Sequence, residues 1–187
     1  MGSFRIASRY AKSLIDLAKE KGQVEQVFAD IKELDNTFEQ SKELKSLFKS
    51  PVIPTDKKLS ITKQLFEGKT SDMLYQFMIL MIKKGRESHL HEIVEQFIVQ
   101  YNKLNGITPV RLISAVKLDS GEVQTMVTAL KAKELLKEVE LVEEVDPELI
   151  GGFILQYGDK MIDQSVKSKL NQLYNIVQDD SYIKKYS

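Results

Sequence analysis

The sequence lacks several features that would assign it to a functional class. It contains no cysteine, so it can form neither a disulfide nor a thiolate metal site. Its 27 lysine and arginine residues balance 27 aspartate and glutamate residues, so it lacks the basic surface typical of proteins that bind nucleic acid. No apolar run approaches the roughly 18 residues that span a bilayer, and we expect no direct membrane insertion. The first residues also lack the apolar segment of a signal peptide, which favours a cytosolic protein, although a mature chain already trimmed of a targeting peptide would look the same.

The first part of the chain carries apolar residues at helical spacing. With 187 residues, 42% hydrophobic and 29% charged, the chain can hold one large or two small globular domains. Six stretches repeat the three-to-four residue spacing of an amphipathic helix. They lie at residues 4–21, 24–38, 44–48, 55–66, 72–82 and 90–104. Gly22 and Gly85 follow two of them, where glycine commonly ends a helix. We therefore predict an all-α six-helix bundle over residues 1–105.

The helical spacing of apolar residues ends at Asn105-Gly106, and β-branched residues become frequent after it. Strands are predicted at residues 108–116 and 139–145, with a helix capped by Asp119 or Ser120 between them. The acidic run 138–148 is typical of a solvated sheet edge, because charge there blocks unwanted pairing; a docking surface for a basic partner is the alternative. Residues 106–187 are expected to form a small α+β domain with a β-hairpin and a terminal helix, so the fold class is α+β overall.

The least generic stretch runs from Asp146 to Ser165. Asp146-Pro147 interrupts the preceding strand, because proline fixes its own φ and restricts the residue before it. Gly151-Gly152 allows a backbone shape closed to other residues. The hairpin is predicted as a strand at 153–157, a tight turn at Gly158-Asp159 and a return strand at 160–163. Ser165 is a suitable N-cap for the last helix, which places Val166, Leu170, Leu173 and Val177 on one face.

Three patterns in the sequence could indicate a site of chemistry. Gly152, Gly158 and Lys160 superficially resemble a phosphate-binding loop, but five residues separate the glycines and Asp159 precedes the lysine. The only histidines, His89 and His91, are two residues apart on a predicted helix and so do not face each other, which disfavours a metal site.

The third pattern is acidic. The carboxylates Asp146, Asp159 and Asp163 could serve a small acid-base hydrolase, which is the alternative function. Two of them stand at turns, where aspartate bonds backbone amides, and Asp163 could cap the last helix or accept turn amides. We therefore predict no catalytic residue, no metal ligand and no cofactor.

Two apolar helical faces point to a protein partner instead. Residues 73–82 are apolar nearly all round, and Ala7, Ala11 and Ala18 form a small-residue face. Most of both must be core, yet a methionine-rich groove can also accept a partner helix. Periodicity alone thus leads to a generic helical adaptor of unknown target.

The pattern Asp146-Pro-x-Leu-Ile-Gly-Gly152, an apolar strand, Gly158-Asp159 and Asp163-x-Ser165 resembles the signature of the F-type ATP synthase delta subunit, the family of the oligomycin-sensitivity-conferring protein. In the first helix, Arg9-Tyr10-Ala11-x-x-Leu14 is similar to the family's opening motif. Asp119-Ser120-Gly121 departs from the family, where Leu-Ser or Leu-Thr is expected.

The resemblance implies a specific role and specific partners. It implies a non-catalytic stator subunit whose helical domain binds the N-terminal helix of an alpha subunit on the catalytic head, and whose second domain binds the b subunits of the peripheral stalk. The first and fifth helices are expected to form the groove for the alpha helix, lined by Ala7, Tyr10, Ala11, Leu14, Phe77 and Met81. The same resemblance implies a peripheral position at the cytoplasmic face of the bacterial plasma membrane.

Overall fold

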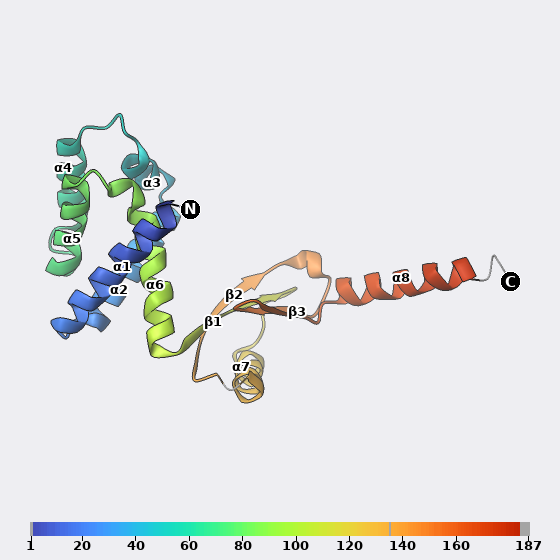
Figure 1. Cartoon of the computed structure of the whole chain (residues 1–187). Coiled ribbons are helices and arrows are strands. Elements are labelled where there is room, and N and C mark those ends of the chain that lie inside the picture. The colour runs from blue at the N-terminus through green and yellow to red at the C-terminus, as the bar shows by residue number, and fades with distance from the viewer. Residues whose placement is uncertain (1, 135, 184–187) are drawn as a thin grey trace. The chain divides into compact units, whose positions relative to one another are not determined.

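The computed structural model describes residues 2–134 and 136–183 and divides into two compact units, Met1–Leu104 and Asn105–Ser187 (Figure 1). Each unit is described by itself. The elements combine helices with a four-stranded sheet, so the predicted α+β class is confirmed. No helix within the described ranges is both long and apolar enough to cross a membrane.

The first unit consists of helices joined by short turns (Figure 1). They are α1 (Gly2–Glu20), α2 (Val24–Gln40), α3 (Lys42–Lys49), α4 (Thr55–Phe66), α5 (Asp72–Lys83), the 3-10 helix η1 (Glu87–His89) and α6 (Leu90–Asn105). Gly22 and Gly85 adopt positive φ values of 66° and 64°, each two residues after the last residue of α1 or α5, as expected of glycines that end helices.

The core of the first unit contains the small-residue face of α1. Ala7, Ala11 and Ala18 are all fully buried, and their short side chains let neighbouring helices approach closely. Larger buried side chains such as Phe38 and Phe97 fill the remaining space.

A buried ion pair joins three elements of this unit. The Nζ atom of Lys58 in α4 lies 2.7 Å from Oε1 of Glu87 in η1 and 3.4 Å from the carbonyl oxygen of Phe48 in α3. The Lys58 side chain is 2% exposed and that of Glu87 is 12% exposed. Because both charges are largely withdrawn from water, each depends on the other for its stability.

The second unit is a four-stranded sheet with a helix on one face. Its elements are β1 (Ile107–Ser114), α7 (Ser120–Glu134), β2 (Glu138–Val145), the 3-10 helix η2 (Pro147–Leu149), β3 (Phe153–Tyr157), β4 (Lys160–Asp163) and α8 (Val166–Ile183). The strand order is β2-β1-β3-β4; β1 and β2 run parallel, and the other two pairs are antiparallel. A parallel pair requires a crossover, and α7 provides it.

The core of the second unit lies between α7 and the sheet. Val110, Leu112, Leu130, Leu155 and Tyr157 form its buried cluster. The strand β2 is an edge strand of the sheet. The prediction that the acidic run 138–148 forms a sheet edge is therefore confirmed for residues 138–145, which make up β2. Only Gly106 lies between the end of α6 and the start of β1, and its φ is 68°.

Candidate functional site

The hairpin forms with the predicted boundaries and depends on Gly152. This residue has a φ of 77°, and a Cβ atom placed on it would lie 2.3 Å from the carbonyl oxygen of Gln164. Gln164 is fixed there because its N–H donates to the Phe153 carbonyl oxygen at 2.9 Å. Any side chain at 152 would therefore collide with backbone that cannot move freely. At Gly151, a Cβ atom would lie 2.9 Å from Cγ2 of Val166, at the start of α8.

The other signature residues make local backbone bonds. Asp146 precedes Pro147 and accepts a hydrogen bond from the Glu148 N–H at 3.0 Å. Gly158 stands in the two-residue turn between β3 and β4 with a φ of 55°. Ser165 caps α8, since its Oγ accepts from the Ser168 N–H at 3.1 Å, as predicted.

Asp163 is engaged in the turn before α8. Its carboxylate accepts a hydrogen bond from the Ser165 N–H at 2.8 Å. Hydrogen bonds from the Ser165 side chain and backbone hold the pKa of Asp163 below its ordinary value of 3.8. The charged form of Asp163 is therefore favoured by folding.

The three carboxylates of the hydrolase alternative do not share a cleft. Asp159 lies in the turn before β4 and Asp163 is the last residue of that strand, so they stand four positions apart along an extended chain, about 13 Å. Asp146 is occupied at η2. General acid-base catalysis needs groups within reach of one reacting atom, so the alternative of a hydrolase built on these residues is wrong.

Replacing Asp163 with alanine is expected to destabilise the second unit by about 1 kcal/mol at pH 7, because a charge-assisted hydrogen bond is lost. A carboxyl whose pKa is lowered by folding stabilises the fold above its unfolded pKa, and this contribution disappears as the pH falls through the folded pKa. The difference between variant and parent should thus shrink below pH 3.8. Urea unfolding at pH 7 and near pH 3 would measure it. Asp159→Ala, in the neighbouring turn, is the control; a pH-independent difference for Asp163→Ala would contradict the assignment.

The two histidines, His89 and His91, lie in separate surroundings in the first unit. Nδ1 of His89 is 3.2 Å from both Ser3 Oγ and Glu92 Oε2, whereas His91 packs edge-on against Phe38 at a ring distance of 5.4 Å. Across the described side chains, no group of three or more His, Cys, Asp or Glu residues could hold a metal ion.

The predicted groove residues on α1 and α5 separate into buried and accessible ones. Tyr10 and Phe77 are half-buried and meet edge-to-face at a ring distance of 6.5 Å, so α1 and α5 lie side by side there. Ala7 and Ala11 are fully buried, Leu14 is 1% exposed and Met81 is 0% exposed. The expectation that Ala7, Ala11, Leu14 and Met81 line a groove open to a partner is therefore wrong, because the side chains of all four lie in the core.

A hollow of about 460 Å³ lies beside this contact. Its apolar lining comes from Leu17, Met73, Phe77 and Leu80, and its polar rim from Lys21, Gln23, Asp72 and Gln76. Leu17 and Leu80 are 41% and 49% exposed, and sequence reasoning missed both. The available signal was spacing: Leu17 follows Tyr10 by two helical turns and Leu80 follows Phe77 by one.

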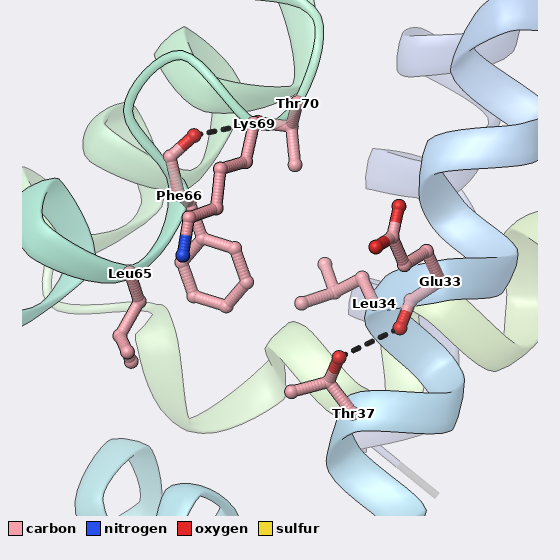
Figure 2. Close-up of a pocket in the computed structure, with 7 residues that line it drawn as sticks. All are labelled: Glu33, Leu34, Thr37, Leu65, Phe66, Lys69 and Thr70. Atoms are coloured by element: carbon pink, nitrogen blue, oxygen red, sulfur yellow. Dashed lines mark hydrogen bonds between the residues drawn. The ribbon is translucent and has the colours of Figure 1, made fainter.

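A second, smaller pocket of about 220 Å³ lies between α2 and the end of α4 (Figure 2). Leu34 lines one side, and Leu65 and Phe66 line the other. The Thr37 hydroxyl donates to the Glu33 carbonyl oxygen at 2.8 Å, and the Thr70 hydroxyl donates to that of Phe66 at 3.3 Å. Both hydroxyls thus donate to backbone carbonyl oxygens rather than to a side-chain base such as the Glu33 carboxylate, which also lines the pocket, so neither is arranged as an activated nucleophile.

The terminal helix exposes an apolar face. Val166, Leu170 and Leu173 repeat at intervals of four and three residues, and all three are exposed. The predicted fourth member, Val177, has a side chain outside the described set. Apolar residues at this spacing form the seam of a coiled coil, and that seam is buried only when a partner helix covers it.

Comparison with known proteins gives consistent matches along nearly the whole chain. The sequence profile of the family described as "ATP synthase delta (OSCP) subunit" matches residues 6–177. The ATP synthase subunit delta of Cytophaga hutchinsonii is 36% identical over 175 residues, covering 94% of this chain and 95% of that protein. The corresponding subunit of Christiangramia forsetii is 32% identical over 186 residues, covering 99% of this chain and all of that protein. Among solved structures, a chain of the Toxoplasma gondii mitochondrial ATP synthase hexamer has the same fold, with a TM-score of 0.71, 22% identity and coverage of 92% of this chain and 97% of that one.

Proposed function

The chain belongs to the ATP synthase delta (OSCP) subunit family, and from this premise we propose that it joins the catalytic head of an F-type ATP synthase to the b subunits of its peripheral stalk. It is a non-catalytic stator subunit, which resists the torque of rotation during ATP synthesis. Such a joint needs large, slowly dissociating interfaces and no chemistry of its own. The observation that carries the proposal is a pair of exposed apolar surfaces, one on each compact unit.

The surface on the first unit suits an amphipathic helix. In this proposal the six helices act as one bundle that holds the hollow between α1 and α5 open. Leu17, Phe77 and Leu80 form the apolar walls of this hollow. The ring of Tyr10 lies beside Phe77, and a tyrosine can cover apolar surface while its hydroxyl stays in water. We propose that the N-terminal helix of an alpha subunit lies here, with apolar residues at helical spacing against these side chains.

Replacing Leu80 with aspartate is expected to weaken binding of an alpha N-terminal peptide by a few kcal/mol, because a charge would be desolvated against an apolar ligand. Tyr10→Asp should have the same direction of effect. The fold should survive both changes, since both positions are already partly exposed. Titration of isotope-labelled protein, followed by NMR, would measure the affinity and map the shifts.

Val99→Asp provides the matched control, because Val99 is an exposed apolar residue of α6 that does not line the hollow. Its affinity for the peptide should equal that of the parent. Shifts confined to the second unit, or unchanged affinity of Leu80→Asp, would place the alpha subunit elsewhere.

The surface on the second unit suits the stalk. The exposed seam of α8 has the spacing that one helix uses to pack along another, and the b subunits would supply the partner helix. With the stalk held at one unit and the head at the other, the subunit would lie peripherally at the cytoplasmic face of the bacterial plasma membrane.

A further inference from the structure

Ile150 combines strain with exposure. Its φ is 67° and its ψ is −37°, and it is the only non-glycine residue with positive φ in the part of the chain that the structure describes. A β-branched residue is a genuine outlier there, because its side chain crowds the backbone. The side chain is nonetheless 67% exposed, so no core packing compensates for the strain.

Local backbone contacts hold Ile150 in this conformation. Its N–H donates to the Pro147 carbonyl oxygen at 3.1 Å, which closes η2. The next residue, Gly151, accepts at its carbonyl oxygen from the Val166 N–H at 2.9 Å. Ile150 is thereby fixed between η2 and the first residue of α8.

The position of Ile150 makes it continuous with the seam of α8. Val166 opens that seam, and a Cβ atom placed on Gly151, the neighbour of Ile150, would lie 2.9 Å from Cγ2 of Val166. Leu170 and Leu173 continue it along the helix. Strain that the fold does not repay is typical of residues positioned for a ligand.

Two lysines beside the seam, Lys167 and Lys169, indicate the charge of a complementary partner helix. When Leu170 and Leu173 occupy the two apolar positions of a heptad, Lys167 and Lys169 occupy the flanking positions that face the partner's flanks. Lys167 lies 3.5 Å from exposed Glu148, and Lys169 has no ion pair in the described structure. An acidic residue at the matching flank of a partner helix would complement them.

We propose that Ile150 is a prepositioned anchor at one end of the α8 seam, for an α-helix with an apolar heptad seam and acidic flanking residues. The proposal rests on the proposed function, in which a stalk helix covers α8. The strained backbone holds the side chain in its bound position before the partner arrives, which lowers the entropy lost on binding.

Ile150→Gly separates the anchor from a merely structural role. Glycine accepts the same backbone angles without strain, so the melting temperature of the second unit should stay level or rise by a few degrees. Binding of the soluble helical part of the stalk b subunit should fall by about tenfold, through a faster dissociation rate. Surface plasmon resonance on the full chain measures binding, and calorimetry measures melting.

Two further variants separate a failure of the Ile150 anchor from a failure of the stalk interface on α8. Val145→Ala removes a similarly exposed apolar side chain, 51% exposed on β2, and should leave binding unchanged. Leu173→Asp places a charge in the seam itself and should abolish binding. If Ile150→Gly lowers the melting temperature, or leaves binding intact while Leu173→Asp abolishes it, the anchor is overturned and the stalk interface stands. If neither variant alters binding, the stalk interface on α8 falls as well.

Discussion

Replacing Gly152 with valine should unfold the second unit or leave it marginally stable. The new Cβ atom would lie 2.3 Å from the Gln164 carbonyl oxygen and 3.1 Å from the Ser165 Cα, both backbone atoms. Valine would also have to adopt a φ of 77°, which a β-branched residue strongly disfavours. Overpacking and backbone strain together should cost about 3–5 kcal/mol, a large part of the stability of a small domain.

Gly158→Ala is the matched control for this prediction. Gly158 also has a positive φ, 55°, but no heavy atom lies within 4 Å of its added Cβ. It should cost only about 1 kcal/mol, from backbone strain alone. Circular dichroism during urea unfolding would compare the two variants, and the helices of the first unit should retain their signal in both. Equal losses would show that the close approach to Gln164 has no special importance.

Glu87→Ala should destabilise the first unit by about 3–5 kcal/mol, because it leaves the buried ammonium of Lys58 without its counter-charge. The ammonium would then keep the carbonyl oxygen of Phe48, 3.4 Å away. The effect should be visible as a large fall in the urea midpoint of the first unit, with the second unit unchanged.

The double variant Lys58→Met with Glu87→Leu tests whether charge is the cause. It removes both charges while keeping similar volume, and such replacements are often neutral or stabilising. Its stability should lie close to that of the parent and well above that of Glu87→Ala. A double variant as unstable as the single one would show that packing around Glu87, rather than the uncompensated charge, determines the loss.

The hairpin could be predicted from sequence because its determinants are local. Gly158-Asp159 fixes a two-residue turn, and the flanking strands begin and end where alternation and glycine indicate. The need for glycine at 152 was also evident, although the atom it avoids, on Gln164, was not. That atom comes close only when β3 and β4 have paired.

For the groove, the sequence predicts which helices form it but not which of their residues face solvent. The helix α5 is apolar on nearly every side, so its sequence does not distinguish Met81, which faces the core, from Leu80, which faces solvent. That distinction depends on which neighbours pack against it. The pair Lys58–Glu87 was also hidden, since 29 residues separate its members and nothing in the sequence links them.

The single residue between α6 and β1 sets the mechanical character of the connection. One residue extends by at most about 3.6 Å, so Gly106 provides almost no slack between the two covalently joined elements. A pull on β1 is felt by the last turn of α6 with hardly any stretching of chain between them. If the stalk holds one unit and the head the other, the connection between them can change direction at Gly106 but cannot lengthen appreciably under load.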